Sequence, residues 1–297
     1  MCLFLAEDEL PLRSTRGLDI EIAGSEINVA VGVARQGHDV CFIGRVGNDA
    51  LGDRVLQTIR AEGVQALVTI DEKQPTGIIV RDRARDGRTT SVAYYRNGSA
   101  GSRLSPSDLG IDALNDARIV FISGITAMIS ATAREFCEKF MSEARAAGAV
   151  IVFDPNIRVR LGAVEEWRRT TVPLLRSADV VLAGDDELDN LGVSVEDLLL
   201  AGVRTIVVKH GSKGATLVEA HRQVELPAFP TQVIDTVGAG DALASGMISG
   251  MLAGLGSVEA VERGIRIASS VVACSGDTAG LPYKGEIPMH AESVVIR

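Results

Sequence analysis

Short apolar runs recur along the chain, each bounded by glycine or by an acidic residue. They lie at 39–44, 117–124, 149–154, 179–184 and 205–211. Runs of this length that are rich in β-branched residues predict strands buried on both faces. Segments with helical spacing separate them, at 27–36, 50–62, 131–147, 165–177 and 195–201. The alternation predicts a largely parallel sheet with helices on both faces, and therefore an α/β fold.

One region departs from this alternation. Residues 76–83 and 89–96 are extended segments on either side of Asp86-Gly87, a dipeptide typical of a tight hairpin turn. Together with 18–22 they predict a small antiparallel sheet that projects from the core. Because two or three strands cannot bury both faces alone, we expect this sheet to act as a lid, as an oligomer interface, or as both.

The segment VIDTVGAGDALASGM, residues 233–247, carries the strongest chemical signal. A strand runs into Gly238-Ala239-Gly240 and then directly into a helix, so successive backbone amides point into one concavity that suits an anion. Asp241 lies in the first turn of that helix, where the helix dipole favours a carboxylate. A carboxylate there can take the proton of a hydroxyl that attacks a phosphoryl group. A helix cap and a tight turn are the alternative interpretation.

Other phosphate-binding motifs do not fit this segment. Leu243 occupies the position of the third glycine of a dinucleotide-binding loop, and no GxxxxGK[ST] sequence occurs. The net charge of −9 leaves no broad basic surface, which argues against a nucleic-acid partner. No apolar run approaches the about 18 residues of a membrane span.

Four widely separated cysteines, at positions 2, 41, 137 and 274, lack CxxC spacing. This argues against a zinc site, a redox pair or a disulfide framework, and we expect a cytoplasmic protein.

Two long segments resemble the signatures of the ribokinase-like (PfkB) carbohydrate kinases. DTVGAGDALASGM is similar to the C-terminal signature, and AGSEINVAVGVARQG followed by FIGRVGNDALG is similar to the N-terminal one. The resemblance extends from Gly24 to Tyr283. It implies a three-layer α/β/α sandwich with a mainly parallel sheet and a projecting β lid. It also implies ATP and Mg²⁺ as cofactors and a homodimer formed through the lid.

The resemblance assigns roles to individual residues. Asp241 matches the general base, and Gly238, Ala239 and Gly240 match the anion hole for the transferring phosphoryl group. Besides Gly238 and Gly240, the nucleotide is expected to contact Asn156, Lys209, Gly211, Ser212 and Gly214. Glu187 matches an acidic residue that acts on Mg²⁺ and its waters, although Gly184 stands where many members have Asn. Without the family context, a β-hairpin around 209–214 and a solvated helix start at 185–187 are the simpler interpretations.

The substrate class follows from smaller similarities. Gly24 and Asn28 match the substrate-binding loop, and the segments VAYYRNGSA and DPNIR resemble 2-keto-3-deoxygluconate kinases more than ribokinases or fructokinases. In that subgroup the substrate carboxylate calls for guanidinium groups, and the contacts match Tyr94, Tyr95, Arg96 and Arg158. SGDTAGLPY places Asp277 near the substrate, whereas Ile79 replaces a frequent aromatic residue. The expected reaction is in-line transfer of the ATP γ-phosphoryl group to a hydroxyl of such a sugar acid.

Other functions remain open on the sequence alone. A kinase for a neutral sugar such as fructose or ribose would be favoured if Tyr94 and Arg96 pointed away from the pocket. A catalytically weak sugar or nucleotide sensor would bind its ligand without needing an aligned base. A nucleoside kinase would need an aromatic sandwich around the base, and the chain has only seven Phe, three Tyr and one Trp.

The N-terminal segment differs from the family pattern. Members usually begin with a strand that ends in a Gly-Glu or Gly-Asp pair, and MCLFLAEDELPL resembles the portion just after that pair. We therefore expect part of the first core strand to be absent, either because Met1 is an internal methionine or because this member is shortened. The expected organisation is a core of 24–74 and 98–297, a lid of 10–23 and 75–97, and a remnant of the first core strand at 1–9.

Overall fold

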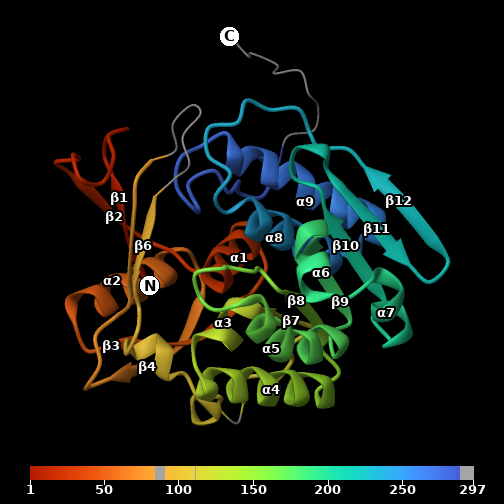
Figure 1. Cartoon of the computed structure of the whole chain (residues 1–297), viewed down its shortest axis with the longest axis horizontal. Coiled ribbons are helices and arrows are strands. Elements are labelled where there is room, and N and C mark those ends of the chain that lie inside the picture. The colour runs from red at the N-terminus through yellow and green to blue at the C-terminus, as the bar shows by residue number, and fades with distance from the viewer. Residues whose placement is uncertain (84–90, 111, 288–297) are drawn as a thin grey trace.

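The parallel sheet expected from the apolar runs is the centre of the molecule. The computed structural model describes residues 1–83, 91–110 and 112–287, and its largest sheet has the order β12-β11-β10-β9-β8-β7 (Figure 1). Its strands are β7 (Ile119–Ser123), β8 (Val150–Asp154), β9 (Val180–Gly184), β10 (Thr205–Lys209), β11 (Ala215–Glu219) and β12 (Arg222–Leu226). Strands β7 to β10 are mutually parallel, and β11 and β12 continue the sheet antiparallel.

The register of these strands determines where chemistry can occur. Ser123 pairs with Asp154, and Lys209 pairs with Gly184, so the last residues of four strands meet at one edge. In open α/β sheets, ligands bind outside the carboxyl ends of the strands. The described fold therefore predicts a site at this edge.

Helices cover both faces of the sheet, which confirms the predicted three-layer α/β/α arrangement (Figure 1). One face is covered by α3 (Gly124–Ile129), α4 (Ala131–Ala146), α5 (Val164–Arg176), α6 (Asp185–Leu191) and α7 (Val195–Leu200). The other face is covered by α1 (Ser25–Arg35), α8 (Ala239–Leu252) and α9 (Ser257–Val272).

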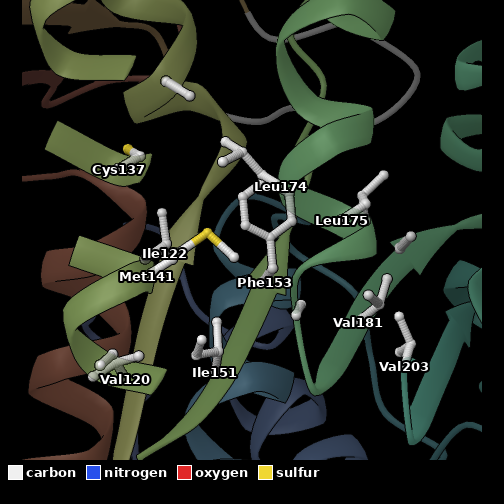
Figure 2. Packing of buried hydrophobic residues seen from close by; sticks show 14 of the residues in the cluster. Val120, Ile122, Cys137, Met141, Ile151, Phe153, Leu174, Leu175, Val181 and Val203 are labelled. Carbon is white, nitrogen blue, oxygen red and sulfur yellow. The ribbon is translucent and has the colours of Figure 1, made fainter. Parts of the chain in front are cut away.

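Alternate residues of each strand enter opposite halves of the core. Ile151 and Phe153 pack with Met141 and Leu174 on the α4–α5 side, as Figure 2 shows, whereas Val152 packs on the α8–α9 side. All five residues of β9 are buried. Because helices cover both faces of this parallel sheet, the sequence of each such strand is a continuous apolar run. These strands could therefore be predicted from the sequence.

The lid is a second sheet with the order β2-β1-β5-β6. Its strands are β1 (Cys2–Ala6), β2 (Leu18–Ile22), β5 (Ile78–Arg81) and β6 (Val92–Tyr95). β1 pairs antiparallel with β2 but parallel with β5, so the sheet is mixed rather than antiparallel as predicted. The expected Asp86-Gly87 turn lies outside the described residues.

The position of the first strand corrects the sequence prediction. Residues 1–9 were expected to be a remnant of a core strand, but Cys2–Ala6 lies inside the lid between β2 and β5. The backbone groups of β1 are paired on both sides, and Leu3 and Leu5 are buried in a cluster with Ile79. These partners, distant in sequence, place the strand in the lid.

The core sheet is interrupted beside β7. β3 (Cys41–Gly47) and β4 (Gln65–Asp71) form a separate parallel pair, connected through α2 (Ala50–Ala61). Among the described residues, β3 pairs with β4 and β7 pairs with β8, each on one edge. Phe42 and Ile43 of β3 and Ile119 and Phe121 of β7 line one common cavity. In the described part of the chain, these two strand edges lie on either side of the cavity without a shared row of hydrogen bonds, and we call this space the gap between β3 and β7.

Two features complete the described chain. Short 3₁₀ turns occur at η1 (Ala100–Arg103), η2 (Pro106–Asp108) and η3 (Gly211–Lys213). Within the described ranges, no helix combines the length and the apolar character that crossing a membrane requires.

Candidate active site

A cavity of about 1560 Å³ lies at the carboxyl edge of the core sheet and is lined by residues of both the lid and the core. Ile79 and Tyr94 line it from the lid, and Asp154, Lys209 and Asp241 line it from the core. Its volume includes the gap between β3 and β7. We refer to it below as the cavity.

Asp241 is held in one orientation by residues of α1. Its Oδ1 accepts a hydrogen bond of 2.6 Å from Ser25 Oγ, and its Oδ2 accepts one of 2.8 Å from Asn28 Nδ2. Gly24 stands just before α1 with a φ of 148°, a conformation that side-chain-bearing residues rarely adopt. This backbone turn starts α1 where Ser25 and Asn28 can reach the carboxylate. The predicted association of Gly24, Asn28 and Asp241 is therefore present in the structure.

The surroundings of Asp241 raise its pKa toward neutral pH. Burial raises its pKa to about 7, the hydrogen bonds from Ser25 and Asn28 act in the opposite direction, and the nearby carboxylates of Asp154 and Asp277 raise it further. A general base is most effective when its pKa lies near the working pH. A buried carboxyl group with such a pKa, at the edge of a cavity, has the properties of a catalytic base.

We expect the pH dependence of kcat/KM to follow the ionisation of Asp241. Asp241 accepts a proton only when ionised, so kcat/KM should rise with pH through a midpoint near 7 and level off above it. The measurement is kcat/KM from pH 5.5 to 9 at constant ionic strength. A profile that is flat between pH 6 and 8 would contradict the assignment, as would the same rising limb in the Asp241→Asn variant.

The start of α8 has a backbone geometry that suits the predicted anion hole. Gly238 precedes the helix in the left-handed region with a φ of 80°, and a Cβ at this position would lie 2.8 Å from the carbonyl oxygen of Asp277. Gly238 and Gly240 line the cavity. A Cβ at Gly240 would lie 3.8 Å from Lys209 Nζ, so a cation stands next to the free amides of the helix. Helix amides and an ammonium group together suit a phosphoryl group.

Lys209 is fixed by two carboxylates, that of Asp154 at the end of β8 and that of Glu187 in the first turn of α6, which follows β9. Its Nζ lies 2.7 Å from Asp154 Oδ2 and 3.5 Å from Glu187 Oε2. Burial alone would lower the pKa of Lys209, but Asp154 and Glu187 raise it above its ordinary value, so the ammonium is charged at neutral pH. The structure thus places Lys209 and Glu187, both predicted, in one cluster with Asp154.

Glu187 has the structural role of a helix cap as well as its place in this cluster. Its Oε2 accepts a hydrogen bond of 2.6 Å from the amide of Gly184, and its Oε1 accepts one of 2.7 Å from Ile157. In the described part of the chain, no three His, Cys, Asp or Glu residues could hold a metal ion by themselves. Mg²⁺ commonly uses one or two carboxylates and completes its shell with phosphate oxygens and water. Glu187 and Asp154 fit that pattern.

The lid contributes a buried cation to the opposite wall of the cavity. Arg96 is 9% exposed and lines the cavity beside Tyr94. Burial lowers its pKa, and Glu26 and Tyr94 act against this decrease. Within the described ranges, its guanidinium donates no hydrogen bond and forms no ion pair, although the carboxylate of Glu26 is close enough to act on its pKa. A buried charge is costly without a partner, so this position favours an anionic ligand group.

Two further predicted substrate residues, Arg158 and Asp277, and the predicted nucleotide contact Asn156 also line the cavity. Arg158 follows β8 and lines the cavity with an exposed side chain. Asp277 also lines it, and its Oδ2 lies 3.4 Å from Asn28 Nδ2. Asn156 is buried with a φ of 45°, and its Nδ2 donates a hydrogen bond of 3.1 Å to Ser25 Oγ. All three therefore lie around the cavity, as predicted.

Five predicted residues do not line the cavity, and Ala239 of the predicted anion hole is one of them. Tyr95 is 66% exposed, because it follows Tyr94 on one strand and successive side chains point to opposite faces. Gly211, Ser212 and Gly214 follow Lys209 but lie outside the cavity wall. At Gly214, a Cβ would meet the carbonyl oxygen of Leu226 at 2.0 Å, so close backbone packing explains this glycine.

Sequence reasoning missed other residues of the site. Ser25 follows the predicted Gly24 directly, and Asp235 is the first residue of the DTVGAGD signature, so both had a signal that could have been used. Arg81 ends a lid strand and carried no signal, although its side chain is buried against Asp235 and Asp277.

Comparison of the sequence with known proteins identifies its family. A family model described as pfkB family carbohydrate kinase matches residues 11–284. The chain is 33% identical to a 2-dehydro-3-deoxygluconokinase of Bacillus subtilis, over 97% of this chain and 91% of the relative. It is 30% identical to a 2-dehydro-3-deoxygalactonokinase of Haloferax volcanii, over 90% of this chain and 87% of the relative.

Solved structures agree with the fold. A PfkB protein from a Polaromonas species superposes with a TM-score of 0.86 at 34% identity, covering 97% of this chain and 96% of that one. A sugar kinase from Pyrococcus horikoshii, solved in complex with ATP, superposes with a TM-score of 0.85 at 27% identity, covering 96% of this chain and 93% of that one.

Proposed function

Because the chain belongs to the pfkB family of carbohydrate kinases, we propose that its substrate is 2-keto-3-deoxygluconate or a closely similar sugar acid. The chain is an ATP-dependent carbohydrate kinase, and the proposal concerns which sugar it phosphorylates. The observation that carries the proposal is the buried guanidinium of Arg96, which lines the cavity without an ion pair or a side-chain hydrogen bond among the described residues. A sugar carboxylate would supply that partner.

The proposed reaction uses Asp241 as the base. The attacking hydroxyl of the sugar lies between Asp241 and the anion hole, and Asp241 takes its proton as the oxygen bonds to the γ-phosphorus of ATP. The bond from that phosphorus to the β-phosphate oxygen breaks in line, and ADP leaves. The amides of Gly238, Ala239 and Gly240 and the ammonium of Lys209 stabilise charge on the transferring oxygens.

The nucleotide and the metal are assigned to the core side of the cavity. The P. horikoshii sugar kinase, 27% identical to this chain, was solved with ATP, which supports a nucleotide site on the same fold. Asp154 and Glu187 would hold Mg²⁺, which supplies neutralisation of phosphate charge when bound. Asn156, Gly211, Ser212 and Gly214 remain proposed nucleotide contacts.

The sugar is assigned to the lid side. We propose that Arg96 binds its carboxylate through a bidentate pair of hydrogen bonds and that Arg158 adds a second, more exposed cation. Asn28 is proposed to bind a hydroxyl, because its Oδ1 lies buried without a hydrogen-bond partner. Asp277 is proposed to bind another hydroxyl at the cavity wall, where its Oδ1 forms an ion pair with Arg81. Ile79, in place of an aromatic residue, would contact the sugar less closely. Tyr94 and Arg96 line the cavity, so the neutral-sugar alternative is not favoured.

The homodimer through the lid also remains a proposal, and the outer face of the lid supports it. The strand register places Tyr94 and Ile79 on the inner face and Tyr95 on the outer one. Leu18 and Ile20 of β2 share that outer face and are 39% and 37% exposed. Exposed apolar patches of this kind commonly bind another protein surface. We place the enzyme in the cytoplasm, where ATP is available and the free cysteines would stay reduced.

The proposed substrate is tested by a coupled assay with Mg²⁺ and ATP. The panel consists of 2-keto-3-deoxygluconate, its galacto epimer, gluconate, fructose and ribose. We expect turnover with the keto-deoxy acids and little with the neutral sugars, because a neutral sugar leaves Arg96 unpaired. Preferential turnover of fructose or ribose would overturn the proposal. ATP binding without turnover of any sugar would favour the sensor alternative.

A further inference from the structure

Arg81 is a buried lid residue that the proposed reaction does not use. It ends β5, its side chain is 3% exposed, and it lines the cavity on the same lid face as Ile79. Its Nη1 donates a hydrogen bond of 2.9 Å to Asp235 Oδ2, and its Nη2 lies 3.3 Å from Asp277 Oδ1. The guanidinium of one lid residue is therefore placed between two carboxylates of the core.

The first of these carboxylates holds the turn that leads into the anion hole. Asp235 Oδ1 accepts a hydrogen bond of 3.1 Å from the amide of Val237, while its Oδ2 accepts the one from Arg81. Val237 directly precedes Gly238, which begins α8. The orientation of Asp235 thus affects the peptide groups that bind the transferring phosphoryl group.

The second carboxylate is connected to the base. Asn28 Nδ2 donates to Asp241 Oδ2 at 2.8 Å and lies 3.4 Å from Asp277 Oδ2. The backbone of Asp277 also packs directly on Gly238, since a Cβ there would lie 2.8 Å from the Asp277 carbonyl oxygen. From Arg81, one series of contacts reaches Asp241 and another reaches the anion hole.

The charges around Arg81 make it difficult to replace. Burial raises the pKa of Asp277, and the guanidinium of Arg81 acts against that rise. Glu21 of β2 is close as well, since its Oε2 lies 3.1 Å from a Cβ at Gly276, and burial and Asp277 raise its pKa. Without Arg81, several acidic groups would face one another with little solvent between them. Breaking a buried charge pair on one side leaves the other charge uncompensated.

We propose that Arg81 is a positioning residue that couples the lid to the catalytic base and the anion hole. With the lid in the described position, Arg81 holds Asp235 and Asp277, and these hold the anion hole and Asn28 in their catalytic arrangement. An opening of the lid withdraws the guanidinium from both carboxylates and releases that arrangement. The proposal rests on the kinase function proposed above, but it does not depend on which sugar is phosphorylated.

Arg83 provides a matched control. It follows Arg81 by two residues, and its side chain also joins the lid to the same core loop, through a hydrogen bond of 3.0 Å to Ser275 Oγ. Its second contact is an ion pair of 2.8 Å with Asp19, which belongs to the lid. Among the described residues, the Arg83 guanidinium forms no hydrogen bond or ion pair with Asp235 or Asp277, so Arg83→Met weakens a lid contact without removing the proposed coupling.

The test compares Arg81→Met, Arg81→Lys and Arg83→Met with the parent enzyme. We expect Arg81→Met to lower kcat by about 10-fold or more, because small displacements of reacting groups have large effects on rate. The dissociation constant of a nonhydrolysable ATP analogue should change by less than about three-fold. Arg81→Lys retains the charge but not the forked geometry, so its kcat should be intermediate. A kcat of Arg81→Met equal to that of Arg83→Met would overturn the proposal.

A second measurement does not require turnover. Hydrogen exchange of the substrate-free enzyme should be faster at the amides of 238–240 in Arg81→Met than in Arg83→Met. If Arg81→Met does not fold, Arg81→Lys is compared with Arg83→Met in both measurements. If no sugar in the panel is phosphorylated by the parent, the proposed substrate has failed and the exchange rates alone decide the role of Arg81. Equal exchange rates in the two variants would overturn it.

Discussion

Replacement of Asp241 by asparagine is expected to lower kcat by about 10²-fold or more. A positioned general base contributes about 10² to 10⁴ in rate, and asparagine keeps the shape of the side chain but cannot accept the proton. Ser25 and Asn28 donate hydrogen bonds of 2.6 and 2.8 Å to this side chain. In the variant, Asn28 can still donate to the amide oxygen and the Ser25 hydroxyl can accept from the amide nitrogen, so the geometry of the site should be retained. The measurement is kcat at saturating ATP and sugar, together with the dissociation constant of ATP.

The control for this variant is Asp53→Asn, an exposed carboxylate in the first turn of α2. It changes the net charge by the same amount and should leave kcat within about two-fold, since surface substitutions away from special features have small effects. Undiminished turnover in Asp241→Asn would remove Asp241 from its assigned role. A loss of ATP binding of the same size as the loss of kcat would point to a binding role.

Replacement of Arg96 by methionine is expected to raise the KM for the sugar acid by about 10- to 100-fold. Charge-assisted hydrogen bonds contribute about 1.5–3 kcal/mol, and each 1.4 kcal/mol corresponds to a factor of ten. The KM for neutral sugars and for ATP should change much less, because neither depends on a sugar carboxylate. Initial rates with 2-keto-3-deoxygluconate and with fructose at high concentration provide this comparison.

Two further variants make the Arg96 experiment specific. Arg158→Ala should raise the KM for acidic sugars in the same direction but by a smaller factor, since its side chain is exposed to water. Arg103→Met removes an exposed arginine that is absent from the cavity lining and should change neither KM. Equal effects of Arg96→Met on acidic and neutral sugars would contradict the carboxylate interpretation.

The sequence predicted most accurately those elements whose signal is local. Strand β8 could be located because burial on both faces leaves a continuous apolar run, and Asp241 could be located because its signature combines a strand, glycines and a helix start. By contrast, β4 was not predicted: its apolar run at 66–68 is followed by Thr69, and in the structure its residues are only partly buried at the edge of a two-stranded sheet. The lid position of β1 depends on pairing with β2 and β5, which the sequence of β1 alone does not encode.

Among the site residues too, the sequence predicted local features better than contacts between distant positions. Tyr94 and Tyr95 were both assigned to the substrate, although strand alternation allows only one of them to face the cavity. Arg81 could not be assigned, because its partner Asp235 lies 154 positions further along the chain. Neighbouring sequence gives no information on such a contact, whereas the Ser25 and Asn28 contacts with Asp241 could be inferred from two signatures of one family.

The gap between β3 and β7 has a mechanical consequence. A continuous sheet resists shear because its strands are joined by rows of hydrogen bonds, but in the described chain no such row joins the β3–β4 pair to the six-stranded sheet. Helix α1 contacts both β3 and β7 and therefore connects the two parts. The same helix carries Ser25 and Asn28, so a shift of α1 relative to either sheet would also move the hydrogen-bond donors that orient the carboxylate of Asp241.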